Sequence, residues 1–183
     1  KKIELDITDT QLQQFDDYFC FLVEKNKVMN LTTIIEKEDV VLKHFIDSIY
    51  IMKYTDFDEK KVIDIGTGAG FPGIPLAIMN PQTSFVLLDS LNKRINFLNE
   101  VCNLCNLSNV ITIHGRAEEI SRKEEYREKF DYVVSRAVAN MSTLLEYCTP
   151  FLKVGGQFIS YKSGKVEEEL SGAQNAMKIL GCK

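Results

Sequence analysis

A loop of alternating glycines, Gly66, Gly68 and Gly70, constrains the fold of this chain more than any other feature. It follows the β-branched apolar run 61–65 and precedes an apolar stretch with helical spacing at 73–79. Glycine permits backbone conformations with positive φ, and it lets a ligand approach the main chain where a Cβ atom would collide. Such a loop between a buried strand and a helix predicts a ligand site at the carboxyl end of the first strand of an open α/β sheet.

Short β-branched runs continue to alternate with helical patterns after this loop. This alternation is typical of a mostly parallel sheet with helices on both faces. The sequence predicts strands at 61–65, 84–89, 110–114, 130–135 and 156–161. It predicts helices near 73–79, 92–105, 117–128, 140–152 and 164–180. We therefore expect a Rossmann-like α/β domain over residues 61–183.

Residues 1–60 differ in composition from the rest, because they hold 8 lysines and arginines against 13 aspartates and glutamates. Two patterns with helical spacing lie in this part, one of Leu12, Phe15, Phe19, Leu22 and Val23, the other of Val40, Val41, His44, Phe45, Ile49 and Met52. We expect residues 1–60 to form an N-terminal helical extension that packs on the main domain.

The composition disfavours membrane-spanning, secreted and metal-binding proteins. No apolar run approaches the roughly 20 residues that a spanning helix needs, and no secretory signal is recognisable. An odd number of cysteines, 5, favours a reducing compartment, and so the cytoplasm. Cys102 and Cys105 have the spacing of a redox pair or half a zinc site, but no second pair completes such a site. Both fall on an apolar helical pattern, which favours packing, and we expect no metal.

The residues around the glycine loop indicate which ligand it binds. The loop lacks the lysine of a phosphate-binding P-loop, and Phe71 stands where a dinucleotide fingerprint needs glycine. Asp64, just before the loop, places a carboxylate where a pyrophosphate would lie, which favours a cationic or zwitterionic ligand. Asp89 ends the second predicted strand, where an acidic residue binds the hydroxyls of an adenosine ribose. Together these residues predict S-adenosylmethionine, and the loop 114–119 could bracket its adenine.

The segment after the fourth predicted strand bears on the methyl acceptor. It reads Ser-Arg-Ala-Val-Ala at 135–139 in place of the polar-Pro-Pro-aromatic segment used for exocyclic amines. Cys148, the nearest cysteine, lies too far along the next helical pattern to serve as the nucleophile of pyrimidine methylation. A ring nitrogen with a free lone pair, such as guanine N7, needs only alignment, so we expect no catalytic base or nucleophile.

Basic residues near the predicted mouth of the site have two possible roles each. Arg136 could bind the cofactor carboxylate or a nucleotide phosphate bidentately, or it could form a salt bridge with Glu118 or Asp131. Lys162 and Lys165 lie after the fifth predicted strand and could contact phosphates, although exposed lysines often have no specific role.

Several of these motifs together resemble the bacterial small-subunit ribosomal RNA methyltransferase G family, also called glucose-inhibited division protein B. The resemblance covers about residues 25–165. Its motifs are the segment from Asp64 to Pro75 (DIGTGAGFPGIP), Leu88–Leu91, Lys93-Arg94, Phe97-Leu98, Ala117–Glu119, Ser135–Ala137, Asn30-Leu31-Thr32 and His44-x-x-Asp47-Ser48.

The resemblance implies a Rossmann-like class I methyltransferase that transfers a methyl group from S-adenosylmethionine to N7 of a guanine in 16S ribosomal RNA. It implies that the acceptor is this RNA, naked or in the 30S particle, and that the last strands of a seven-stranded sheet are absent from this chain. We expect a monomer. Spacing and resemblance together give the expected cofactor contacts: Asp64, Gly66, Gly68, Gly70, Phe71, Asp89, Ser90, Ala117, Glu118 and Arg136. The expected substrate contacts are Asn30, His44, Arg136, Lys162 and Lys165.

Other interpretations remain open at this stage. A net charge of −4 counts against strong nonspecific RNA binding, although basic side chains could converge locally if the N-terminal helices cover the mouth of the site. His44 could be a packed helix residue, and Asn30 a turn or a helix cap. The chain could instead methylate a small molecule or a protein, or bind nucleotides without catalysis. An NAD-dependent oxidoreductase is disfavoured by Phe71.

Overall fold

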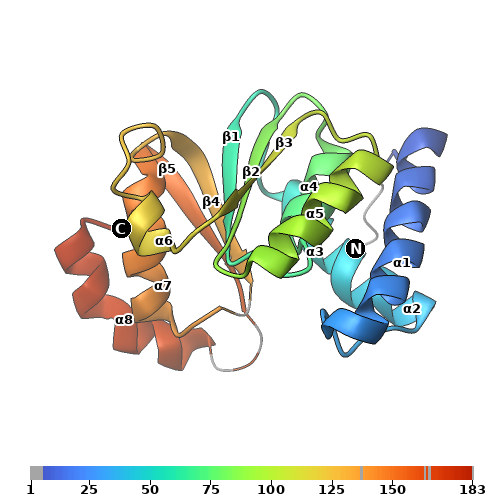
Figure 1. The fold of residues 1–183 in the computed structure, drawn as a ribbon. Coiled ribbons are helices and arrows are strands. Elements are labelled where there is room, and N and C mark those ends of the chain that lie inside the picture. The colour runs from blue at the N-terminus through green and yellow to red at the C-terminus, as the bar shows by residue number, and fades with distance from the viewer. Residues whose placement is uncertain (1–5, 137, 163, 165, 183) are drawn as a thin grey trace.

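A parallel sheet of five strands forms the centre of the computed structural model, which describes residues 6–136, 138–162, 164 and 166–182 (Figure 1). The strands lie in the order β3-β2-β1-β4-β5. Their bounds are β1 Lys61–Ile65, β2 Ser84–Asp89, β3 Val110–His114, β4 Phe130–Arg136 and β5 Leu152–Tyr161. The first three strands have the predicted bounds, whereas β4 ends one residue later and β5 begins earlier than predicted. The expected Rossmann-like α/β arrangement is confirmed.

The register brings the ends of the strands to one edge of the sheet. Ile65 pairs with Leu88, and Asp89 with His114. The order of the strands reverses around β1, because β2 lies on one side of it and β4 on the other. In open α/β sheets, ligands bind outside the carboxyl ends of the strands at such a switch point.

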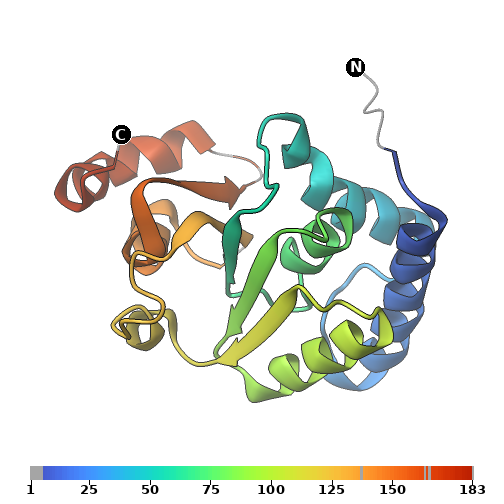
Figure 2. The same cartoon turned by 90° about the horizontal axis from the view of Figure 1, so that it is seen from above.

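Helices cover both faces of the sheet (Figures 1 and 2). On one face lie α4 (Gly73–Met79) and α5 (Asn92–Leu104), and on the other α6 (Ala117–Ile120), α7 (Met141–Cys148) and α8 (Val166–Leu180). Side chains of β1 alternate between the two layers: Val62 packs with Leu76 of α4, whereas Ile63 packs with Cys148 of α7. Because both faces are covered, residues 62–65 of β1 are all buried, including the charged residue Asp64.

The N-terminal segment packs on the face that carries α4 and α5. Helix α1 (Asp9–Met29) starts with a capping box between Thr8 and Gln11. Its buried face consists of Phe15, Tyr18 and Leu22, so the predicted helix exists but Leu12 of its expected apolar face is exposed.

The second predicted N-terminal helix is a continuous helical stretch from residue 37 to residue 53 with changes of pitch. It comprises α2 (Lys37–Val40), the π-helix η1 (Val41–Ile46), α3 (Asp47–Ile49) and the 3₁₀-helix η2 (Tyr50–Lys53). Pitch changes of this kind occur often at functional sites.

One predicted helix is wrong in length, because the pattern at 117–128 forms only the four residues of α6 before a series of turns. Residues 121–128 are mostly charged and exposed and offer no apolar stripe to pack against the sheet, so nothing stabilises a longer helix. The helical pattern at 140–152 likewise ends as the 3₁₀-helix η3 (Thr149–Phe151). No helix in the described ranges is long and apolar enough to cross a membrane.

Candidate functional site

The glycine loop adopts a conformation that other residues would strain. Gly66, Gly68 and Gly70 have φ values of +68°, +62° and +102°. The N–H groups of Gly66 and Thr67 both donate to the carbonyl of Leu88, at 2.9 and 3.1 Å, and so fix the loop to the end of β2. A Cβ atom on Gly70 would lie 2.6 Å from Cγ1 of Ile74 and 2.9 Å from Oη of Tyr18. Glycine is therefore required here both by conformation and by packing.

Asp64 stabilises the glycine loop through hydrogen bonds to its side chain. Its side chain is fully buried, and Oδ2 accepts hydrogen bonds from Oγ1 of Thr67 at 2.7 Å and from the N–H of Gly73 at 2.9 Å. Oδ1 is buried and has no hydrogen-bond partner among the described residues. Burial raises the pKa of this carboxyl to about 7, partly opposed by the two hydrogen bonds. Asp64 thus ties β1 to the start of α4, and its direct contact with a ligand stays a prediction.

Asp89, at the end of β2, also stabilises the glycine loop through hydrogen bonds to its side chain. Its Oδ2 accepts from the N–H of Gly68 at 2.9 Å and from Nη1 of Arg94 at 3.2 Å, and its Oδ1 accepts from the N–H of Leu91 at 2.9 Å. A carboxylate offers about four acceptor positions, so one remains for a ligand hydroxyl. The residue stands at the end of β2, where the sequence places a ribose acceptor.

A cavity of about 180 Å³ opens at the carboxyl ends of β1, β2 and β3. Five of the predicted cofactor contacts line it, namely Gly66, Asp89, Ser90, Ala117 and Glu118. Its other lining residues are Ile65, Leu88, Gly115, Arg116, Val138 and Tyr147. The cavity therefore joins the glycine loop, the end of β2 and the loop after β3.

Sequence reasoning missed Val138 and Tyr147. A Cβ atom on Gly66 would lie 2.6 Å from Cγ2 of Val138, so the valine side chain rests directly on this glycine. Tyr147 reaches the cavity from α7. Neither residue type indicates a place in a ligand site from sequence alone. Both contacts depend on the path that the chain takes from the end of β4 into α7.

Phe71 and Arg136 lie beside the cavity without lining it. Phe71 is buried and stacks on His44, with ring centroids 4.4 Å apart, and the guanidinium of Arg136 lies 4.9 Å from the Phe71 ring centroid. Arg136 forms an ion pair with Asp47 at 3.0 Å. The expected alternative partners of Arg136 are wrong, because Glu118 pairs with Arg116 and Asp131 with Lys153.

The other expected substrate contacts that the structure describes, His44, Asn30 and Lys162, each interact with another part of the chain. His44 is half-buried, and burial together with the Arg136 charge lowers its pKa to about 4. Asn30 is the exposed C-cap of α1 with φ of 51°, which matches its alternative role as a helix cap. Lys162 donates to the carbonyl of Ala139 at 2.6 Å and pairs with Glu169 at 2.7 Å. Lys165 lies outside the described residues.

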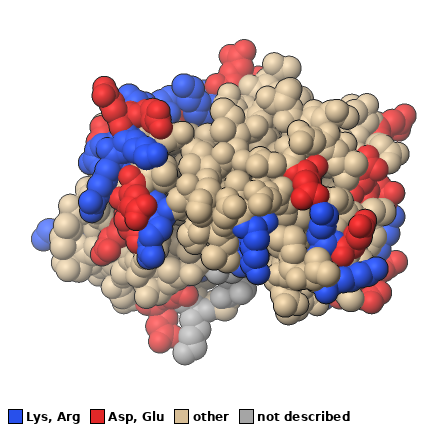
Figure 3. Space-filling model, viewed as in Figure 1, with Lys and Arg blue, Asp and Glu red and all other residues tan. Residues whose placement is uncertain are grey.

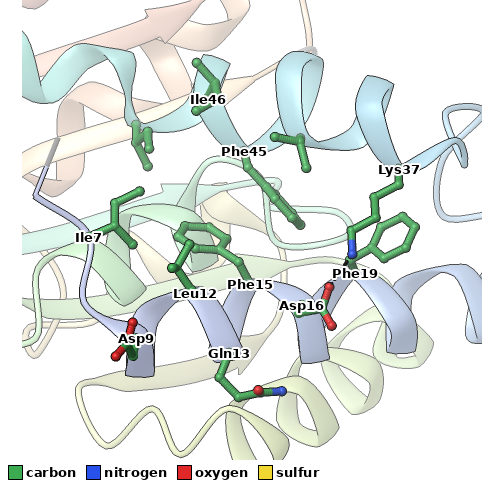
Figure 4. A pocket seen from close by; sticks show the side chains of 12 residues that line it. Ile7, Asp9, Leu12, Gln13, Phe15, Asp16, Phe19, Lys37, Phe45 and Ile46 are labelled. Carbon is green, nitrogen blue, oxygen red and sulfur yellow. Dashed lines mark hydrogen bonds and ion pairs between the residues drawn. The ribbon is translucent and has the colours of Figure 1, made fainter. Parts of the chain in front are cut away.

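A larger cavity of about 490 Å³ lies between α1 and the helical stretch 37–53 (Figure 4). Its walls are mainly apolar side chains such as Leu12, Phe15 and Phe45, with the ion pair between Lys37 and Asp16 at its edge. None of the predicted cofactor contacts lines it. The smaller cavity, where the glycine loop and the carboxylate of Asp89 meet at the ends of the strands, is the better candidate for a polar ligand.

The cysteines and acidic residues of the described ranges form no metal site, since no group of three His, Cys, Asp or Glu side chains is arranged to hold an ion there. Cys105 is buried in the apolar cluster beneath α1 and Cys102 packs against it, as the helical pattern predicts. Burial raises the pKa of Cys102 to about 11 and that of Cys105 to about 12, so both remain thiols at neutral pH.

Comparison with known proteins identifies relatives along the whole chain. The family described as "rRNA small subunit methyltransferase G" matches residues 11–183. The Ribosomal RNA small subunit methyltransferase G of Lachnoclostridium phytofermentans is 53% identical over 100% of this chain and 76% of its own length. The protein of the same name from Desulforamulus reducens is 50% identical over 99% of this chain and 76% of its own length.

Solved structures of lower identity share the fold. M. jannaschii TYW2, determined in complex with AdoMet, has a TM-score of 0.62 and 20% identity, over 81% of this chain and 66% of that one. Precorrin-6y C5,15-methyltransferase from Geobacter metallireducens has a TM-score of 0.58 and 15% identity, over 84% of this chain and 75% of that one.

Proposed function

Because the chain belongs to the rRNA small subunit methyltransferase G family, we propose that it is an S-adenosylmethionine-dependent enzyme that methylates N7 of a guanine in 16S ribosomal RNA. The observation that carries the proposal is the cavity at the switch point of the sheet. There a glycine loop with bare backbone and the carboxylate of Asp89 lie where a nucleoside cofactor is bound in open α/β folds.

The lining of the cavity supports roles for four of the predicted cofactor contacts. The free acceptor position of Asp89 suits a ribose hydroxyl, with Ser90 beside it. Ala117 and Glu118 line the wall that follows β3, where an adenine edge would lie. About 180 Å³ is less than the roughly 300–1,000 Å³ of typical ligand pockets, so we expect Val138 to move off Gly66 when the cofactor binds.

The chemistry proposed for this site requires alignment rather than acid–base catalysis. When bound, S-adenosylmethionine supplies a methyl group on a positively charged sulfur, and the N7 lone pair of guanine is free to attack it. Cys148 is fully buried, and burial raises its pKa far above neutrality, so a thiolate nucleophile is not formed there. The residues of the cavity therefore serve to bind and orient the two reactants.

The charge distribution bears on how RNA is bound. Acidic and basic side chains are interspersed on the two flanks of the face in Figure 3, and the region between them is largely uncharged. Such a surface supports little nonspecific affinity for phosphates, which agrees with the net charge of −4. We propose that recognition depends on the shape of the 30S particle and a few placed cations, and that the enzyme acts there as a cytoplasmic monomer.

Transfer of labelled methyl groups tests the proposal. The chain is incubated with tritiated S-adenosylmethionine and with either 30S particles or naked 16S ribosomal RNA from cells that lack the enzyme, and 7-methylguanine is mapped. We expect label at a single guanine of the 30S particle. Cofactor binding without transfer to either RNA would favour a noncatalytic nucleotide-binding protein, and label on a protein or small molecule would favour another acceptor.

Replacing Asp89 with asparagine is expected to weaken S-adenosylmethionine binding by about 1–3 kcal/mol, the usual loss for a charged hydrogen-bond acceptor. Asparagine has one acceptor oxygen, so it cannot serve the N–H groups of Gly68 and Leu91, Arg94 and a ribose hydroxyl together. Titration calorimetry measures the affinity, with thermal unfolding as the control for folding. Unchanged affinity in a folded variant would move the ribose contact to another residue.

A further inference from the structure

Two tyrosines differ from the other aromatic residues of the chain because their side chains are exposed. The chain has 11 phenylalanines and 7 tyrosines. Of these rings, all of which lie in the described ranges, only Tyr50 and Tyr54 are exposed, with 42% and 67% of the residue accessible to solvent. A single exposed aromatic residue is ordinary, but two neighbours in a chain that covers all its other rings indicate a contact surface.

The two rings lie next to each other with a lysine beside both. Their centroids are 5.9 Å apart and their planes are inclined by 57°, so the rings are not stacked face to face. Nζ of Lys53 lies 5.8 Å from the centroid of Tyr50 and 5.5 Å from that of Tyr54, within the range of a cation–π contact. Lys53 has no ion pair with any residue that the structure describes. Tyr50, Lys53 and Tyr54 form a surface that we name the tyrosine patch.

The tyrosine patch has a rigid support. Tyr54 is the C-cap of η2, and its N–H donates to the carbonyl of Ile51 at 2.8 Å. Ile51 and Met52 pack into the apolar cluster formed by residues of β1, α4 and β4. Earlier in the same stretch, the carbonyl of Ser48 accepts from Oη of Tyr161 at 2.7 Å. The patch is therefore attached to the sheet before any ligand binds, which lowers the entropic cost of binding.

The tyrosine patch continues a helix face that begins beside the cavity. Asp47 forms the ion pair with Arg136 there, at 3.0 Å. Residues three and four positions apart share a helix face, so Asp47, Tyr50 and Tyr54 lie in one row. The seven residues from Asp47 to Tyr54 correspond to about 10 Å along a helix. Successive stacked nucleotides are about 3.4 Å apart, so roughly three of them span the distance from the cavity to the patch.

The charges around the patch determine which form of RNA fits it. The patch carries the one cation of Lys53, and the turn that follows carries Asp56, Asp58 and Glu59. Because these carboxylates repel phosphates, the surface is poorly suited to a duplex, whose two backbones need several cations. Bases of a single strand, by contrast, stack on aromatic rings whatever their sequence, and one lysine is enough for an adjacent phosphate. The ligand that fits the patch is an unpaired stretch of RNA.

We propose that the tyrosine patch binds unpaired nucleotides that flank the target guanine, with bases stacked on Tyr50 and Tyr54 and a phosphate on Lys53. The proposal rests on the proposed function, because it takes ribosomal RNA as the substrate. None of the three side chains lines the cofactor cavity. The patch therefore acts on the choice of RNA, since it favours a guanine whose neighbours are single-stranded and free to stack.

Replacing both tyrosines with leucine tests the stacking. Leucine keeps an apolar side chain and a high helix propensity but has no flat ring. Co-sedimentation gives the Kd for 30S particles, methyl transfer gives KM and kcat, and calorimetry gives the Kd for S-adenosylmethionine. We expect Tyr50→Leu/Tyr54→Leu to bind 30S particles roughly tenfold more weakly or worse, the scale of one lost base stack. The KM for 30S particles rises accordingly, whereas kcat and the Kd for the cofactor stay unchanged.

Phenylalanine at both positions is the conservative variant, because it keeps the rings and loses only the hydroxyls. We expect Tyr50→Phe/Tyr54→Phe to bind 30S particles within about twofold of wild type, since the faces of the rings remain. Leu42→Ala is the matched control, because Leu42 is a 62% exposed apolar side chain of the same helical stretch without a ring. We expect it to leave the Kd for 30S particles unchanged.

Three results would overturn the proposal. The first is unchanged affinity of the folded leucine variant, which thermal unfolding verifies. The second is an equal loss in the phenylalanine variant, which would assign the effect to the hydroxyls. The third is an equal loss in Leu42→Ala, which would assign it to exposed apolar area of any kind. If the double leucine variant does not fold, Tyr54→Leu alone decides, because Tyr54 is the more exposed of the two.

Replacing Lys53 with glutamine tests the phosphate contact. We expect the slope of log Kd against log salt concentration to fall by about 0.7, the value for one phosphate of a single strand. An unchanged slope would overturn the part assigned to Lys53.

Ultraviolet cross-linking of the wild-type chain to 30S particles identifies what the patch touches. A nucleotide attached to Tyr50 or Tyr54 supports the proposal, and a peptide of a ribosomal protein attached there instead overturns it. Co-sedimentation and cross-linking do not require methyl transfer. A wild-type chain that binds and cross-links to the RNA without methylating it would therefore contradict the proposed function and leave the patch confirmed as an RNA-binding surface.

Discussion

Replacing Gly70 with alanine is expected to destabilise the chain by roughly 3 kcal/mol or more and to abolish S-adenosylmethionine binding. The φ of +102° is strained for any residue with a Cβ atom. The new methyl group would also lie 2.6 Å from Cγ1 of Ile74, 2.9 Å from Oη of Tyr18 and 3.0 Å from Cδ2 of Leu98. These neighbours come from three helices packed around the loop, so no single side chain can move to relieve the contact.

Tyr18 makes the position especially sensitive. The tyrosine is fully buried, and its hydroxyl donates to the carbonyl of Ala69 at 2.5 Å, so displacement of its ring also breaks a bond to the loop. Urea unfolding measures the loss of stability, and calorimetry measures the loss of binding.

Gly172→Ala provides the matched control, because Gly172 lies in α8 with nothing within 4 Å of an added Cβ atom. Alanine there is expected to stabilise the chain by about 0.5–1 kcal/mol through its higher helix propensity. A Gly70→Ala variant as stable as wild type, with intact binding, would show that the loop tolerates a side chain and that its glycines are not needed for the ligand.

The centre of the fold could be predicted because its signals are local. The β-branched runs of β1, β2 and β3 are bounded by turn residues, so their limits follow from the sequence alone. The same holds for Asp89, whose place at the end of β2 is a matter of position along one strand. Once the strands are parallel, their ends share an edge, and the cavity residues of three separate segments come together without further information.

The partners of buried and charged side chains could not be predicted, because they depend on contacts between distant segments. Arg136 pairs with Asp47, a residue 89 positions away, rather than with the acidic residues expected. Tyr18 reaches Ala69 across 51 positions. Asp64, a predicted cofactor contact, is fully buried, and its Oδ2 accepts from the N–H of Gly73 at the start of α4. Each outcome is set by how the N-terminal helices and α4 pack on the sheet, which no local pattern encodes.

Burial of Asp64 leads to a second large effect, a dependence of stability on pH that Asp64→Asn should remove. The carboxyl has a pKa of about 7 in the folded chain and an ordinary value of 3.8. Between these values the folded chain keeps a proton that the unfolded chain has released, so the free energy of unfolding falls as pH rises and levels off above about 7. Each pH unit corresponds to about 1.36 kcal/mol for one proton, so the contribution of Asp64 falls by about 2–3 kcal/mol between pH 5 and pH 7.5.

Asparagine keeps an acceptor for Thr67 and Gly73 but carries no charge that burial could penalise. The stability of wild type relative to Asp64→Asn should therefore decrease by about 2 kcal/mol or more from pH 5 to pH 7.5, as measured by urea unfolding at both values. Asp131→Asn is the control. Desolvation alone would raise the pKa of Asp131, but the hydrogen bonds from Lys61 and Lys153 and the charge of Lys153 together outweigh it and hold this pKa below its usual range, so the contribution of Asp131 is constant over this interval. A constant difference for Asp64→Asn as well would mean that the carboxylate is charged in the folded chain, and that its hydrogen bonds outweigh the cost of burial.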